Sequence, residues 1–215
     1  MDVILDAIEI RVLGSLMEKE LATPEYYPLS LNALINACNQ KTNRLPVLAL
    51  DDKTVATALH TLKTKQMVYQ SDAGRVPKYW QTFTKQKNLI IREAALLSLL
   101  LVRGPQTAGE LRSRSERLYA FDHLEEVVQA LDNLLSAGLI IRMPLQPGKK
   151  EPRFAHLLAG EPENIDQGRA CQEPIMVTVE TENARIAALE HTVAYLKDEI
   201  ELLKQEFLTF KKEFE

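Results

Sequence analysis

Cysteine is scarce in this sequence. Cys38 and Cys171 are the only two in 215 residues, and they lie far apart in segments of different character. Secreted domains that depend on disulfides need several closely spaced cysteines. The sequence therefore excludes that architecture and is typical of a reducing compartment, so we expect a cytoplasmic protein.

Long apolar runs are missing as well. The most apolar stretch, Ala94 to Val102, is about half as long as the ~18–20 residues that a membrane span requires. At the N-terminus, Asp2 and Asp6 stand where a secretory signal would carry basic residues. We therefore predict a soluble protein with no signal peptide and no membrane partner.

Residues that carry enzyme chemistry are few and scattered. The four histidines have no Cys, Asp or Glu at the spacing of zinc or hydrolytic sites, and the eight glycines form neither a phosphate-binding loop nor a Gly-x-Ser-x-Gly elbow. Cys38 lies on the apolar side of a predicted helix, where a core role is the more common one. We predict a binding protein that is not an enzyme and holds no metal and no cofactor.

Charge is distributed unevenly along the chain. The formal net charge is −4, yet residues 1–86 carry +1, residues 87–160 carry +2 and residues 161–215 carry −7. Because the acidity is concentrated in the last segment, the overall balance does not exclude nucleic acid binding by the rest of the chain.

Hydrophobic periodicity divides the first 86 residues into three helices and a hairpin. Apolar residues recur at helical spacing over the first 20 residues, and Thr23-Pro24 ends that helix. Ser30 is the predicted N-cap of a short second helix, and Asp51 or Asp52 that of a third. A hairpin around a glycine turn follows at residues 67–83. This order is that of a winged helix.

The same order recurs in the next part of the chain. Helices are predicted at about residues 92–102, 108–118 and 124–137, and Gly138 is the expected stop of the third. A second hairpin follows, and the repetition strengthens both assignments. The predicted fold is mainly α with small β-hairpins (α+β): tandem winged-helix domains at residues 1–86 and 87–160, a linker at 161–178 and a C-terminal coiled coil at 179–215.

The tail repeats apolar residues in heptads. β-branched residues at a and leucine at d favour a parallel two-stranded coiled coil, and flanking pairs such as Glu199 with Lys204 have opposite charges. A tail helix that folds back on the winged-helix domains of its own chain would bury the same row of apolar residues, and this alternative stays open. The predicted dimer interface consists of Ile186, Leu189, Val193, Leu196, Ile200, Leu203, Phe207 and Phe210.

Candidate contacts to DNA or to a protein partner are basic and polar residues in several places. The third helix of the first domain presents a polar face, and the loop before it holds many hydrogen-bond donors, which serve equally well to cap the neighbouring helices. In the second domain the third helix is acidic, so the basic groups fall on its second helix and hairpin. The candidates are Lys53, Thr57, His60 and Lys63 on the first of these helices, Lys41 and Arg44 in the loop, and Arg112, Arg114, Lys149, Lys150 and Arg153 in the second domain.

Two long motifs resemble a known family. Thr23 to Asn32, continuing through Cys38 to Arg44, and Leu100 to Arg114 are similar to the two signatures of the YceH-like family of uncharacterised bacterial proteins. The resemblance implies a tandem winged-helix fold in a bacterial cytoplasm. It implies no activity from which site residues could be transferred.

Two functions fit these observations. One is a DNA-binding or regulatory protein, paired by its tail so that two bodies engage one duplex. The other is an interaction scaffold whose winged helices contact proteins, without direct DNA binding. The fold alone does not choose between them.

Overall fold

The computed structural model describes residues 4–161 and Lys204. Apart from Glu161 and Lys204, the predicted linker, the predicted coiled coil and its interface positions lie outside the described residues.

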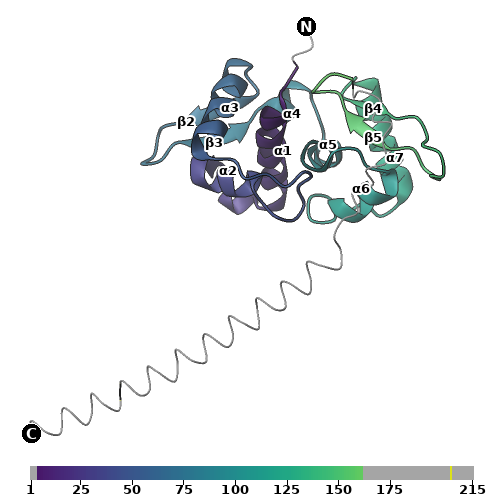
Figure 1. Cartoon of the computed structure of the whole chain (residues 1–215), viewed down its shortest axis with the longest axis horizontal. Helices are drawn as coiled ribbons and strands as arrows, with labels where there is room; N and C mark the ends of the chain where they lie inside the picture. The colour runs from purple at the N-terminus through teal and green to yellow at the C-terminus, as the bar shows by residue number, and fades with distance from the viewer. Residues whose placement is uncertain (1–3, 162–203, 205–215) are drawn as a thin grey trace, which may run out of the picture. The chain divides into compact units, whose positions relative to one another are not determined.

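The first half of the described chain consists of three helices followed by a hairpin (Figure 1). Three small elements were not expected from the sequence: a 3-10 turn after the first helix, a short strand before the second helix and a single helical turn after the hairpin. The elements are α1 (Ala7–Ala22), the 3-10 turn η1 (Pro24–Tyr26), β1 (Leu29–Ser30), α2 (Leu31–Cys38), α3 (Asp52–Thr64), β2 (Val68–Ser71), β3 (Lys78–Gln81) and α4 (Phe83–Gln86).

Side-chain caps explain where these helices begin. The Asp6 carboxylate accepts the backbone N–H groups of Ile8 and Glu9 at the start of α1. The Ser30 hydroxyl caps α2, as predicted, and Asp51 rather than Asp52 caps α3. These polar groups satisfy backbone donors that a helix leaves unpaired in its first turn.

The second half repeats the layout with α5 (Ile91–Arg103), α6 (Ala108–Ser115), α7 (Leu124–Ser136), β4 (Ile140–Arg142) and β5 (Phe154–His156). The third helix of each half ends in the same turn. Met67 N–H donates to Leu62 O at 2.9 Å, and Leu139 N–H donates to Leu134 O at 3.0 Å. The residue before each donor, Gln66 or Gly138, has a φ of 61° or 66°. The predicted stop at Gly138 is confirmed.

A buried glutamate joins the first helix to the third in both halves. Glu9 accepts the N–H of Asp6 at 2.8 Å and Nζ of Lys65, just after α3, at 2.7 Å. Burial raises the pKa of Glu9, but the hydrogen bonds from Lys65 and Asp6 outweigh it, so the pKa lies below its usual value. Glu93 in α5 accepts Nδ2 of Asn133 in α7 at 2.8 Å in the corresponding place.

The two sheets are small and antiparallel. The first has the order β1-β3-β2 and the second pairs β4 with β5. In the second half a single bridge between Gln106 and Phe154 takes the place of β1, just before the Thr107 cap of α6. Within residues 4–161 the chain is thus a mixed fold of seven α-helices and small antiparallel sheets.

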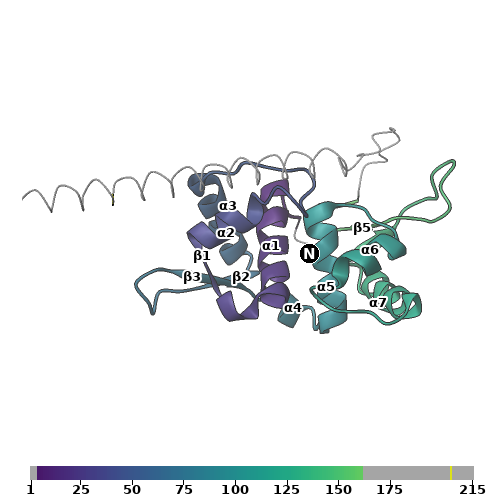
Figure 2. The same ribbon diagram turned by 90° about the horizontal axis from the view of Figure 1, so that it is seen from below.

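α1 and α5 lie side by side at the centre, with the remaining elements of each half on either side (Figures 1 and 2). Buried apolar residues of both halves form one hydrophobic cluster through these two helices. Gly14 of α1 allows the closest approach, against Leu101 and Val102 of α5. The predicted domain boundary at residue 86 falls at the end of α4, within a body that shares this core.

Substitution of Gly14 tests the contact between α1 and α5. A Cβ there would lie 2.7 Å from Leu101 Cβ, which cannot rotate away because it is bonded to the backbone. Although alanine normally stabilises a helix by roughly 0.5–1 kcal/mol over glycine, we expect Gly14→Ala to lower the unfolding free energy by about 1–3 kcal/mol. Urea denaturation measures it. Gly109→Ala in α6 is the matched control, since its Cβ would meet nothing closer than 3.9 Å and should cost nothing. A Gly14→Ala protein as stable as the parent would contradict the packing.

His156 is the source of a predicted acid sensitivity. It lies opposite Ile140, where Gln81 lies opposite Val68 in the first half. Its Nδ1 is buried without a partner among the described residues, and burial lowers its pKa from 6.5 to about 4. The unfolded chain therefore takes up a proton here below pH ~6.5 that the folded chain does not accept until pH ~4, so stability falls within that window.

We expect this histidine to account for a loss on the order of 1–2 kcal/mol in unfolding free energy between about pH 7 and pH 5. His156→Gln introduces the residue that Gln81 provides at the same position of the first half. Urea denaturation at both pH values should show a smaller loss of unfolding free energy for this variant than for the parent. His60→Gln, on an exposed site, should keep the full loss. Equal acid sensitivity of His156→Gln and the parent would disprove the assignment.

Candidate functional site

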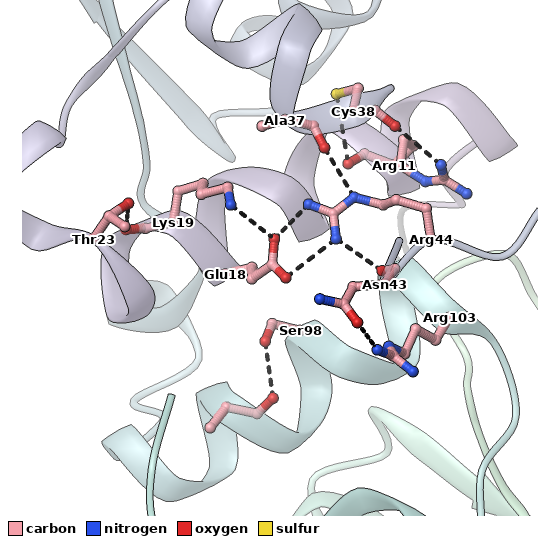
Figure 3. Close-up of polar contacts among 11 residues, drawn as sticks. Arg11, Glu18, Lys19, Thr23, Ala37, Cys38, Asn43, Arg44, Ser98 and Arg103 are labelled. Carbon is pink, nitrogen blue, oxygen red and sulfur yellow. Dashed lines mark hydrogen bonds and ion pairs between the residues drawn. The ribbon is translucent and has the colours of Figure 1, made fainter. Parts of the chain in front are cut away.

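The loop between α2 and α3 is held in place by a buried arginine (Figure 3). Arg44 Nε donates to Ala37 O at 2.9 Å and Nη1 donates to Asn43 O at 2.8 Å. Both terminal nitrogens also reach the carboxylate of Glu18 on α1, with Nη1 at 3.1 Å from Oε1. Arg44 is 4% exposed. The expectation that Arg44 contacts a partner is therefore corrected: its donors are used inside the protein.

A second arginine and an asparagine anchor the rest of this loop. Arg11 of α1 is buried and donates to Cys38 O at 3.1 Å and to Pro46 O at 2.7 Å. The Asn39 side chain exchanges two hydrogen bonds with the backbone of Leu50, both 2.8 Å long. Leu45 N–H donates to Val102 O of α5 at 2.9 Å. The loop is thus bonded to both central helices and fixes where α3 begins.

Cys38 is a core residue, as predicted. It is fully buried at the end of α2, and burial raises the pKa of its thiol. A protonated, inaccessible thiol is neither a nucleophile nor a metal ligand. Among the residues that the structure describes, no group of three or more His, Cys, Asp or Glu side chains could hold a metal ion. No helix in that part is long and apolar enough to cross a membrane.

α3 carries the predicted polar face. Lys53, Thr57 and His60 are exposed along it. The Thr57 hydroxyl donates to Lys53 O at 2.9 Å, so the threonine is ordered by its own helix. Lys63 is half-buried, and its Nζ donates to Gln70 Oε1 of β2 at 2.6 Å, which joins the helix to the hairpin. Lys41 is exposed in the preceding loop.

The hairpin beside α3 holds basic and aromatic residues that the sequence analysis did not select. Residues 60–88 contain six Lys or Arg and a single acid, Asp72, a net charge of +5. Of these cations, Arg75, Lys78, Lys85 and Lys87 are exposed. The charge count over residues 1–86 concealed this excess, because acids on α1 and around the loop offset it. A shorter counting window would have revealed it.

The candidate arginines of the second half mostly support its own structure. Arg112 donates to Asp122 O at 2.7 Å and Arg114 to Gln106 Oε1 at 2.8 Å. Arg153 donates to Pro105 O at 2.7 Å and pairs with Glu110 at 3.1 Å. Lys149 and Lys150 are exposed beside a shallow pocket at the end of the hairpin, which is also lined by Thr107, Met143, Pro144, Gln146, Glu151 and Arg153.

α7 differs from α3 in surface chemistry. Leu124 and Val128 are 39% and 42% exposed, and Glu125 and Asp132 are exposed on the same helix. The exposed carboxylates of this helix repel phosphates. Of the basic candidates of the first half, the structure thus leaves Lys41 and Lys53 exposed and buries Arg44, while α7 of the second half has an acidic surface.

Within the described residues the fold is mainly helical with two small antiparallel sheets, and the first half carries exposed cations on its hairpin and just after it. Residues 5–149 match the model of a family described as a protein of unknown function, DUF480. The chain is 50% identical to a UPF0502 protein of Solibacter usitatus over 96% of its length and the whole of that relative. It is 49% identical to one of Geobacter sulfurreducens over the full length of both chains. The chain belongs to this DUF480/UPF0502 family, and the expectation of an uncharacterised bacterial family is confirmed.

Removing the Arg44 side chain should destabilise the fold. Arg44→Ala leaves the buried Glu18 carboxylate with only the longer contact to Lys19 Nζ at 3.8 Å, and breaking a buried ion pair typically costs about 3–5 kcal/mol. Urea denaturation of the full chain measures the loss. Replacing both partners, Glu18→Met with Arg44→Met, should recover part of it, because no uncompensated charge remains.

Lys41→Ala is the control for this pair. Lys41 is an exposed cation in the same loop, and its removal should change the unfolding free energy by less than about 0.5 kcal/mol. If Arg44→Ala were as mild as Lys41→Ala, the ion pair would not hold the loop.

Proposed function

We propose that the two halves of the body are winged-helix modules and that the first binds double-stranded DNA through the exposed face of α3 and the adjoining hairpin. The observation that carries the proposal is the set of exposed cations on the hairpin and just after it, Arg75, Lys78, Lys85 and Lys87, in a segment (residues 60–88) whose single acid is Asp72. Phosphate neutralisation by Lys and Arg supplies most of the affinity of sequence-independent DNA binding.

The geometry of the first module supports this use. The third helix of a winged helix commonly enters the major groove. Lys53, Thr57 and His60 lie on the exposed face of α3, and the Lys63–Gln70 hydrogen bond ties that helix to the hairpin. In this arrangement the helix meets base edges while the hairpin cations meet phosphates.

On this proposal the chain is a cytoplasmic, non-enzymatic binding protein that acts as a dimer. The heptads of the tail would bring two first modules to one duplex, so a single DNA-binding module in each chain would suffice. The acidic, partly apolar α7 would then lie away from the DNA.

A second candidate function is a protein interaction scaffold. The observation that favours it is the pair of exposed apolar residues on α7, Leu124 and Val128, which stand among acids. Apolar residues exposed together on one helix are typical of protein contact surfaces. In this case the winged-helix bodies would bind proteins and not DNA.

A salt titration separates the two functions. We expect the full-length protein to bind a labelled random duplex at about 50 mM salt, with the affinity falling roughly 40-fold by about 200 mM if three phosphates are contacted. Fluorescence anisotropy measures both values. Absence of binding at about 50 mM would reject the DNA proposal and favour the scaffold.

Matched charge reversals locate the DNA-binding surface. Lys53→Glu with Arg75→Glu should weaken duplex binding at least tenfold, whereas Lys149→Glu with Lys150→Glu, the same change in charge on the second hairpin, should alter it much less. All four side chains are exposed, so neither pair should unfold the protein. A larger loss from the second pair would place the DNA on the second module.

A further inference from the structure

The first hairpin has an outer face that the core does not use. β2 and β3 pair antiparallel, with Tyr69 opposite Trp80 and Ser71 opposite Lys78. Successive residues of a strand point to opposite faces of a sheet. Val68 and Gln81, which pair next to the aromatic residues, are buried, so Tyr69, Trp80 and Lys78 occupy the face away from the core.

Tyr69 and Trp80 form a contacting aromatic pair on this face. Their ring centroids are 4.6 Å apart with an interplanar angle of 42°, and Tyr69 is 55% exposed. Other aromatic residues nearby have structural roles. The Tyr27 hydroxyl accepts the N–H of Gln81 at 2.7 Å, and Tyr79 packs against the hydrophobic core. No such role accounts for the exposed ring of Tyr69.

The charges around the pair suit a polyanion. Lys78 lies on the same face two residues from Trp80, a separation of about 7 Å along a strand. Arg75 is exposed at the tip of the hairpin. The single acid of residues 60–88, Asp72, accepts a hydrogen bond from Gln70 Nε2 at 2.6 Å. Exposed rings bordered by cations are the arrangement on which unpaired bases stack while the phosphates are neutralised.

We infer that the outer face of the first hairpin, formed by Tyr69, Trp80 and Lys78, is a stacking site for unpaired bases of single-stranded nucleic acid. The inference rests on the proposed function, because it uses the same basic module. It adds a substrate that the duplex proposal does not include. Bases within a duplex already stack on one another and present only their edges, whereas an unpaired base exposes the face that an aromatic ring can cover.

Trp80 reports directly on this face, since it is the single tryptophan of the chain. We expect a twenty-nucleotide oligothymidylate to quench the Trp80 fluorescence of the full-length protein in a saturable manner at about 50 mM salt. Poly-glutamate of similar length carries negative charge without bases and should quench little. Equal quenching by poly-glutamate would reduce the effect to charge attraction and overturn the stacking site.

Variants of Tyr69 test the stacking itself. Tyr69→Ala should weaken oligothymidylate binding by about tenfold, within the range expected for loss of a base–aromatic stack. Tyr69→Phe keeps the ring and should restore binding. Tyr26→Ala, at a tyrosine that is 72% exposed in η1, is the matched control and should change the affinity less than twofold. Duplex affinity should be little changed in all three variants.

The outcomes also separate this inference from the proposed function. Duplex binding that persists together with unchanged oligothymidylate affinity in Tyr69→Ala would overturn the stacking site and leave the DNA proposal standing. Failure of both oligothymidylate and duplex to bind at about 50 mM salt would overturn both.

Discussion

The buried contact between Arg44 and Glu18 is the interaction on which the proposed interface depends. The loop from α2 to α3 is far longer than the turn of a simple helix-turn-helix, and ordering a long loop costs conformational entropy. Arg44 bonds the loop to α1 and to the end of α2, and Arg11 holds the loop backbone at Pro46. Hydrogen bonds from these two buried arginines order the long loop, whereas a short turn would need no such support. The orientation of α3, and with it the basic face, follows from these contacts.

The two halves share internal bonds and differ in surface. Each uses a buried glutamate to join its first helix to its third and the same turn to enter its hairpin. These bonds set the layout of the backbone and leave the outward positions free to vary. α3 therefore displays Lys53 and His60, whereas α7 displays Leu124 and Glu125 on an equivalent scaffold. A repeat of this kind can offer a chemically distinct surface to each of two different partners.

The sequence predicted the longer helices well because helix periodicity and capping residues lie within the helices or next to them. Periodicity located the helices, Ser30 marked the start of α2, and Gly138 marked the end of α7. β1 escaped because a strand of two residues has no periodicity, and its existence depends on β3, far along the chain. The burial of Arg44 escaped for a similar reason. A basic residue in a polar loop looks solvent-exposed, and only the fold shows that Glu18, 26 residues earlier, lies beside it.

Availability, more than residue type, decides which cations can meet a ligand. Arg44 and Arg153 have the chemistry of phosphate contacts, yet each already donates to groups within the protein. A ligand phosphate would have to replace those hydrogen bonds and gain little net free energy. Lys53, Arg75 and Lys78 instead keep exposed side chains. Their charge interacts with a polyanion at no cost to the fold, and for this reason the first hairpin and α3 form the stronger candidate interface.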